Sequence, residues 1–174
     1  MFLYMLKHSP ELLERRTKLI EKETAQKLIA ALMSMVILFT YLLSGLDKRY
    51  SWSTVPAPIV IAAEGVALLG FALYFLVVKE NAFASRIVVV EENQEVITIG
   101  PYALVRHPMY TAILLIYLCT PVALGSYWTM IPASSLAVLL VARIRTEELT
   151  LSRELEGYHE YKENVKYRLV LGVW

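Results

Sequence analysis

The sequence predicts an all-α integral membrane protein with about four transmembrane helices, a helical hairpin near the C-terminal end and a cytoplasmic segment after it. Three observations predict this fold class. Hydrophobic residues make up 57% of the 174 residues and charged residues only 19%, against roughly 25% charged residues in soluble proteins. Residues 28–46 and 108–142 contain no charged side chain, and residues 56–78 contain only Glu64. All but two of the 17 lysine and arginine residues lie on one side of the resulting topology.

The uncharged runs set the number of spans. A helix that crosses a bilayer needs about 20 apolar residues, so each of the first two runs provides one helix. The run 108–142 is too long for one span and long enough for two short ones, and Gly125-Ser126 near its middle is a natural turn. We expect membrane helices over residues 28–46, 57–78, 108–124 and 127–143.

The distribution of positive charge predicts the orientation. Lysine and arginine residues concentrate in residues 1–27, 79–107 and 143–174, and cytoplasmic loops of membrane proteins carry such an excess. Both termini and the 79–107 loop are therefore expected in the cytoplasm. The net charge of +1 gives no general attraction to nucleic acid. Cys119 is the only cysteine, and with three dispersed histidines it forms neither a disulfide framework nor a zinc pattern.

We expect one domain over residues 1–174, beginning with a charged stretch at residues 1–27. Within it, Ser9 and Pro10 start a helix that continues to residue 27. That helix is either solvated in the cytoplasm or lies on anionic lipid. Residues 28–78 supply the first two membrane helices, and residues 79–174 supply a loop, the hairpin and the last segment.

The second span contains three residues that need an explanation. An ionisable side chain at the position of Glu64 normally faces a bundle interior or a polar cavity. It is either a structural carboxyl group or part of a substrate path. Gly65 and Gly70 are expected to allow close helix packing.

Aromatic residues lie near the predicted outer ends of the helices, as interfacial aromatic residues do, namely Tyr50, Trp52, Tyr127 and Trp128.

A polar cluster precedes the hairpin. Residues 79–99 are mixed polar, with a short extended piece expected at residues 87–90, and Gly100-Pro101 marks a turn. Pro108 fits the first turn of a helix, and His107 before it is pushed toward a cap position. A guanidinium group, an imidazole and two phenols thus gather where an apolar helix begins, namely Arg106, His107, Tyr102 and Tyr110.

A second polar group follows the hairpin. Arg143 and Glu147 are four residues apart, so they share one face if the helix continues past the membrane surface. Both ends of a hairpin lie on the same side of the membrane, so Arg143, Glu147 and Glu148 are expected near the His107 cluster. The pattern also fits ordinary snorkelling of arginine and tyrosine at an interface. A break at Gly157 is expected within a short amphipathic helix.

The ordered set of motifs carries a resemblance. Arg106-His107-Pro108-Met109-Tyr110, then Arg143-x-x-x-Glu147-Glu148, then Tyr158-x-x-Tyr161 resembles the isoprenylcysteine carboxyl methyltransferase family. More broadly, it is similar to the membrane phospholipid methyltransferases. The resemblance covers roughly residues 79–174. It implies S-adenosylmethionine as the methyl donor, bound at the cytoplasmic face without a Rossmann domain, and the chain indeed contains no G-x-G motif.

The resemblance also implies roles for individual residues. Arg143 would hold the carboxylate of a lipophilic, isoprenylcysteine-like acceptor, and Glu147 would act with it as a catalytic residue and also contact the donor. The positions expected to contact the donor are Gln94, Glu95, Val96, Ile97, Tyr102, His107, Pro108, Met109, Tyr110 and Glu147. The implied partners are a prenylated or other lipophilic substrate and membrane lipid, and the oligomeric state is open.

Three other functions remain open from the sequence. A phospholipid amine N-methyltransferase would need a proton acceptor, which Glu148 or Glu64 would supply. A sterol-reductase-like enzyme using NADPH has similar C-terminal patterns. A non-catalytic membrane scaffold or small transporter draws its support from Glu64 within a span.

Overall fold

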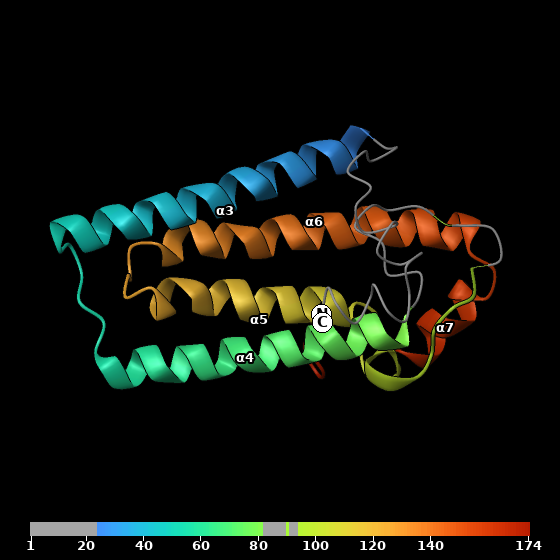
Figure 1. The fold of residues 1–174 in the computed structure, drawn as a ribbon. Helices are drawn as coiled ribbons and strands as arrows, with labels where there is room; N and C mark the ends of the chain where they lie inside the picture. Colours follow the sequence, from blue (N-terminus) through green and yellow to red (C-terminus); the bar gives the residue numbers. More distant parts are fainter. Residues whose placement is uncertain (1–23, 82–89, 91–93) are drawn as a thin grey trace, which may run out of the picture.

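The computed structural model describes residues 24–81, 90 and 94–174. Every regular element in these residues is helical (Figure 1). The elements are α3 (Thr24–Tyr50), α4 (Ala57–Glu80), the short 3₁₀ helix η1 (Gly100–Ala103), α5 (Pro108–Ala123), α6 (Met130–Glu154) and α7 (Tyr158–Asn164).

Four long helices lie side by side in the order α3, α6, α5, α4 (Figure 1). The largest contacts are between α4 and α5 and between α3 and α6, and α5 also packs against α6. The hairpin α5–α6 therefore lies between the two earlier helices. The connections α3–α4 and α5–α6 lie at one end of the helices, and η1 and α7 lie at the other.

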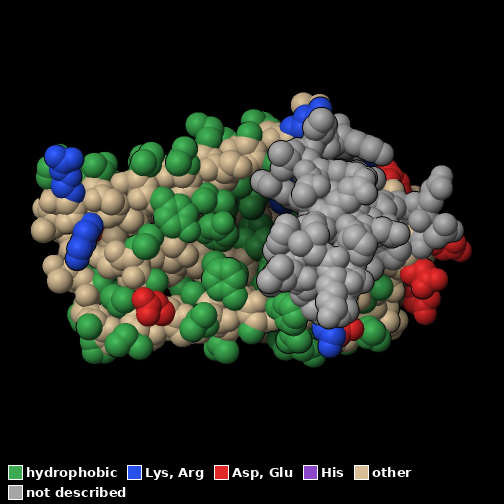
Figure 2. All heavy atoms as spheres, viewed as in Figure 1, with side chains coloured by type: hydrophobic (Ala, Val, Ile, Leu, Met, Phe, Trp, Pro, Cys, Tyr) green, Lys and Arg blue, Asp and Glu red, His purple; other side chains and the backbone are tan. Residues whose placement is uncertain are grey.

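Two of these helices are long and apolar enough to cross a membrane, namely α3 and α4, while α5 is a shorter apolar helix. Most side chains of α3 and α4 face outward, and they include large hydrophobic ones such as Met35, Leu68 and Leu69, each 67% exposed. Figure 2 shows hydrophobic side chains spread over this face with few charged ones between the two ends. Soluble proteins rarely expose so much contiguous apolar surface, whereas a lipid-facing surface needs it.

Each of the four long helices overlaps one expected helix range, but several of the first and last residues differ. The turn at Gly125 is confirmed, with φ of +78° between α5 and α6. Helix α6 continues to Glu154, well past the expected end at residue 143, and its polar half includes the buried residues Arg143, Glu148 and Thr150. The break at Gly157 is also confirmed: α6 ends at Glu154, and Gly157 with φ of +79° precedes α7.

One prediction for the second span is confirmed and two are wrong. A Cβ atom at Gly70 would lie 2.8 Å from Ile116 Cγ1, so Gly70 allows α4 and α5 to approach closely. Gly65 has nothing within 4 Å of such an atom. Glu64 is exposed rather than directed inward. The reason is helical phase: Ala63 and Gly70 lie on the buried face of α4, which turns the side chain at 64 outward.

Some expectations fall outside the described residues. Of the helix expected over residues 9–27, residues 9–23 lie outside the described part of the chain. Of the extended piece expected at residues 87–90, only Val90 is described. Residues 24–27 form the first turn of α3.

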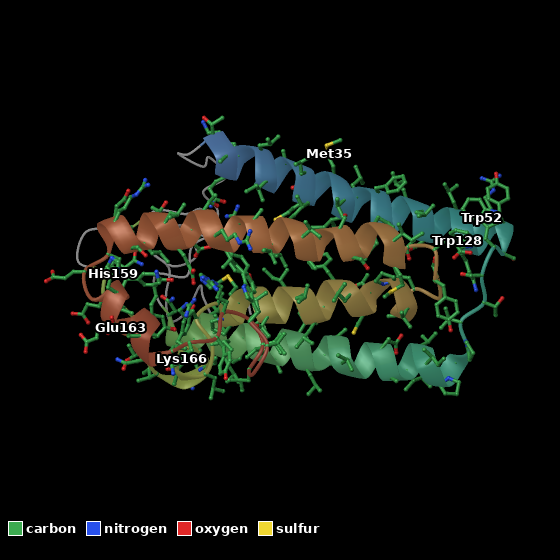
Figure 3. All side chains as sticks on the ribbon, turned by 180° about the vertical axis from the view of Figure 1, so that it is seen from behind. Met35, Trp52, Trp128, His159, Glu163 and Lys166 are labelled. Atoms are coloured by element: carbon green, nitrogen blue, oxygen red, sulfur yellow. The ribbon has the colours of Figure 1, made fainter. Side chains whose placement is uncertain are left out.

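The end of the helices that carries the two connections is held by a buried carboxylate, that of Asp47. Its Oδ1 accepts a hydrogen bond from the Ser53 backbone N–H at 2.7 Å, and its Oδ2 accepts one from the Ser53 hydroxyl at 2.5 Å. The Ser126 hydroxyl also donates to Oδ2. Figure 3 shows Trp52 and Trp128 near one another at this end, far from His159, Glu163 and Lys166. Asp47 thus joins the α3–α4 connection to the α5–α6 connection.

Candidate active site at the α7 end

The candidate site is built on the first turn of α5. His107 is the N-cap residue, with φ of −124° and ψ of 59°, and Pro108 occupies the first helical position. The sequence folds this way because the residue before a proline avoids helical geometry. Arg106, His107 and Pro108 are all buried. The motif therefore places a guanidinium group and an imidazole inside the protein at a helix start.

Glu148 on α6 collects three side chains at its carboxylate. Arg106 Nε donates to Oε1 at 2.8 Å, and Arg168 Nε donates to Oε2 at 2.9 Å. His107 Nε2 lies 3.3 Å from Oε1. We call these four residues the Glu148 cluster. Arg106, His107 and Glu148 are buried, and Arg168 is half-buried.

The Glu148 carboxyl group is held ionised by its partners. Burial raises its pKa, but the hydrogen bonds from His107, Arg106 and Arg168 outweigh burial and lower the pKa to about 2. A carboxylate in this state is a weak base, so Glu148 is suited to anchoring cationic side chains rather than to accepting a proton.

The last part of the chain is tied to this cluster through its backbone. The backbone N–H groups of Arg106 and His107 donate to the carbonyls of Tyr167 and Arg168, both at 2.9 Å. Arg106 Nη1 donates to the Val165 and Lys166 carbonyls at 2.7 and 2.9 Å. The segment after α7 therefore lies along the chain that leads into α5.

A second chain of contacts connects α5 with α6. Arg143 Nε donates to the Tyr110 hydroxyl at 3.0 Å, and that hydroxyl donates to Glu147 Oε2 at 2.5 Å. The ring of Tyr110 also stacks on that of His107, with centroids 5.8 Å apart. Arg143 and Glu147 are thus joined through a phenol from the opposite helix. We call this arrangement the Arg143–Tyr110–Glu147 relay.

Helix α7 closes this end with an aromatic cluster. Leu155, Tyr158, Tyr161 and Val165 are buried together, and Val96 packs against them. The Tyr161 hydroxyl donates to the Tyr102 carbonyl at 2.8 Å. The buried Tyr158 hydroxyl has no hydrogen-bond partner in the described part of the chain. Burial raises the pKa of both Tyr158 and Tyr161 well above the usual value, so both phenols stay protonated donors.

The sequence-predicted site residues occupy this end as follows. His107, Pro108 and Arg143 are buried, and Glu95 is exposed. The half-buried positions are Gln94, Val96, Ile97, Tyr102, Met109, Tyr110 and Glu147. Direct contacts join Arg143, Tyr110 and Glu147 to one another. In the 94–97 stretch, Val96 packs against the buried side chains around α7.

Three features were missed by the sequence reasoning. The first is the contact of Arg168 with Glu148. The basic, aromatic character of residues 165–174 was the available signal that this segment would contact the site. Glu148 was expected near the His107 cluster, but its role as the common partner of Arg106, His107 and Arg168 was missed, because, of the two adjacent glutamates, the resemblance assigned a site role to Glu147 alone. Gln26 on α3 is wholly buried, and it donates to Thr146 Oγ1 at 2.6 Å, next to Arg143. No motif surrounds Gln26, so the sequence offers no signal for it beyond a polar residue near a span.

Comparison with known proteins bears on this arrangement. The model of the isoprenylcysteine carboxyl methyltransferase family matches residues 59–153. That is more than half of the chain, and it includes the first turn of α5 and Arg143, Glu147 and Glu148 on α6. A search of curated proteins found no match. Because this family model matches more than half of the chain, the chain belongs to the isoprenylcysteine carboxyl methyltransferase family, a family of membrane methyltransferases.

Proposed function

We propose that the protein transfers a methyl group from S-adenosylmethionine to the carboxylate of a lipophilic, isoprenylcysteine-like acceptor at a cytoplasmic membrane surface. The observation that carries the proposal is the Arg143–Tyr110–Glu147 relay, which places a cation and a carboxylate on one face of α6 in a family of methyltransferases. A cation suits the acceptor, and a carboxylate suits the positively charged donor.

The proposed setting is a bilayer crossed by four helices, α3, α4, α5 and the first half of α6, with both termini in the cytoplasm. Two observations support it. The charge-free runs and the lysine and arginine distribution fit this topology. Trp52 and Trp128 lie together at one end, as aromatic residues at one membrane surface would (Figure 3). The site would then lie at the opposite, cytoplasmic surface.

The residues at the α7 end fit the chemistry of the proposed donor. The buried Tyr158 hydroxyl is a hydrogen-bond donor without an acceptor among the described residues, and Glu147 offers a carboxylate for an amino group or ribose hydroxyls. Aromatic rings for stacking come from Tyr102, His107 and Tyr110. The remaining proposed donor contacts are Gln94, Glu95, Val96, Ile97, Pro108 and Met109. When bound, S-adenosylmethionine supplies a methyl group on a positively charged sulfur.

The proposed mechanism relies on positioning rather than on proton transfer. A carboxylate acceptor is ionised at neutral pH, so it needs no general base. Its oxygen would form the new bond to the methyl carbon while the carbon–sulfur bond breaks. Arg143 would orient that carboxylate by charge-assisted hydrogen bonding, and Tyr110 would keep the guanidinium group of Arg143 in place. Holding two reactants in line supplies a large part of the rate enhancement in such a reaction.

The contacts of Glu148 favour a carboxylate acceptor over an amine. An amine acceptor would require a proton acceptor, and the sequence suggested Glu148 or Glu64 for that role. Glu148 is committed to Arg106, His107 and Arg168, with a pKa of about 2. Glu64 is exposed on the outward face of α4. Methyl incorporation into prenylcysteine analogues should therefore exceed that into phosphatidylethanolamine, and the reverse preference would contradict the proposal.

Two measurements on purified protein in lipid nanodiscs test the proposal. Calorimetry should detect binding of S-adenosylhomocysteine, and folded protein that shows none would refute donor use. Arg143→Ala should lower turnover by at least about a hundredfold, the order seen when one preorganised contact to reacting charge is lost, while retaining donor affinity. Arg145→Ala is the matched control, because Arg145 is exposed two residues further along α6. Equal loss of turnover and affinity in Arg143→Ala would contradict its assigned role.

A further inference from the structure

The segment after α7 ends in a structured loop with an apolar outer surface, formed by residues 169–174. A main-chain oxygen of Trp174 accepts hydrogen bonds from the backbone N–H groups of Leu169 and Val170 at 2.8 and 3.1 Å. The Trp174 N–H donates back to the Val170 carbonyl at 3.2 Å. Three apolar side chains of the loop are exposed, namely Val170 at 45%, Leu171 at 56% and Val173 at 78%. Backbone closure thus presents apolar side chains outward.

The contacts of this segment with α5 place the loop at the level where α5 begins to be apolar. Successive carbonyls of Tyr167 and Arg168 accept from the N–H groups of Arg106 and His107. The Leu169 carbonyl then accepts from the Thr111 hydroxyl at 2.8 Å. Both segments run in the same direction, so the chain after α7 follows α5 inward. Thr111 lies three residues into α5, about 4.5 Å along its axis.

The figures agree with this placement. Figure 1 marks the end of the chain over α5 and α4, not beyond α7, and the view from behind shows the same segment at the same level along the bundle (Figure 3).

The base of the loop carries groups that suit a membrane surface. The Arg168 guanidinium lies over the Trp174 ring, 5.0 Å from its centroid. The two residues before Arg168, Lys166 and Tyr167, are exposed. Tryptophan, tyrosine and basic residues are typical of the headgroup region, where rings and cations have both apolar and polar neighbours.

We propose that the 169–174 loop inserts its exposed apolar side chains into the cytoplasmic leaflet of the bilayer, at the boundary between headgroups and acyl chains. The partner is membrane lipid, and the apolar loop surface continues the lipid-facing surface of the helices. Since the base of the loop holds the backbone at Arg106 and His107, this insertion anchors the Glu148 cluster against the membrane surface. The inference depends on the proposed arrangement of spans but not on the methyl-transfer reaction.

Site-specific fluorescence labelling of the full chain in nanodiscs of phosphatidylcholine and phosphatidylglycerol tests this. In a Cys119→Ser background, single cysteines replace Val173, Glu163 as an exposed α7 control, and Leu69 as a lipid-facing control, each labelled with an environment-sensitive dye. We expect iodide in the water to quench the dye at position 173 several-fold less than at position 163. Doxyl-labelled phosphatidylcholine should quench it several-fold more.

Two results would overturn the inference: quenching by iodide at position 173 equal to that at position 163, or protection from both quenchers, which would mean that protein covers the loop. The Leu69 dye reports separately on the spans. If iodide quenches it fully, the four-span arrangement is wrong, whatever the methyl-transfer assays show. A lipid-protected Leu69 dye with a water-exposed dye at position 173 refutes the loop insertion alone.

Discussion

The two ends of the helical bundle each contain a buried carboxylate, and the two are satisfied by opposite kinds of partner. Asp47, at the end with Trp52 and Trp128, accepts from two serine hydroxyls and a backbone N–H. Glu148, at the α7 end, accepts from two guanidinium groups and lies beside an imidazole. The hydrogen-bond donors to Asp47 are uncharged, whereas two positively charged guanidinium groups donate to Glu148.

This difference indicates that Asp47 has a structural role, whereas Glu148 belongs to the candidate active site. Among the described residues, the partners of the Asp47 carboxylate come from the two connections, so its hydrogen bonds fix one connection against the other. The partners of Glu148 come from the residues before α5 and from the segment after α7, and they adjoin the Arg143–Tyr110–Glu147 relay. Loss of either carboxylate should lower stability, but only loss of Glu148 should also affect donor binding. Four predictions test this contrast, in order of expected effect.

The largest effect is expected for Glu148→Gln. The substitution keeps the shape but leaves Arg106, His107 and Arg168 without a counter-charge, and breaking a buried ion pair costs about 3–5 kcal/mol. Thermal unfolding in detergent should show a much lower midpoint, and calorimetry should show weakened binding of S-adenosylhomocysteine. Glu154→Gln, at an exposed position of the same helix, should change neither. Wild-type donor affinity in a folded Glu148→Gln protein would show that the cluster is only structural.

Acidification should reproduce part of this loss. The folded-state pKa of Glu148 is about 2, below the ordinary value of 4.5, so its contribution to stability is fully present above pH 4.5. That contribution is lost as the pH falls from 4.5 toward 2. The stability difference between wild type and Glu148→Gln should therefore be constant above this window and shrink within it. A difference that stays constant down to pH 2 would contradict the assignment.

A smaller effect is expected for Asp47→Ala, which leaves the Ser53 N–H and two hydroxyls without their acceptor. Unsatisfied buried donors of this kind lower the free energy of unfolding by about 2 kcal/mol. Donor affinity and turnover should remain at wild-type values, because the substitution lies at the opposite end from the relay. Measuring the unfolding midpoint and donor affinity on one preparation checks both halves of the prediction. A drop in affinity as large as that in Glu148→Gln would remove the contrast between the ends.

The smallest effect concerns the helices that join the two ends. Gly70→Ala places a Cβ atom 2.8 Å from Ile116 Cγ1 and 3.2 Å from the Ala112 carbonyl oxygen, and overpacking of this kind costs about 1–3 kcal/mol. The alanine regains up to about 1 kcal/mol in helix propensity, so a modest net loss is expected. Gly65→Ala is the matched control without such a contact, and it should be neutral or slightly stabilising. Equal behaviour of the two variants in thermal unfolding would show that α4 and α5 are less closely packed.

Much of the site was predictable because its motifs act locally. The proline at 108 determines where α5 begins and makes His107 its cap, and the four-residue spacing places Arg143 and Glu147 on one side of α6. Tyr110 lies one turn into the facing helix, so a contact with that side was a reasonable expectation. The hydrogen bonds of the Tyr110 hydroxyl with Arg143 and Glu147 depend on the distance between α5 and α6. No local sequence motif determines that distance.

The sequence by itself determined the helix positions, the hairpin turn and the two polar clusters, since charge-free runs, prolines and glycines act through local backbone and solvation preferences. Only the tertiary structure decided which glutamate meets which partner. Neighbouring residues on a helix point about 100° apart, so the rotation of α6 assigns Glu147 to Tyr110 and Glu148 to the arginines. The rotation of α4 likewise turns Glu64 outward, because packing at Gly70 fixes the opposite face against α5.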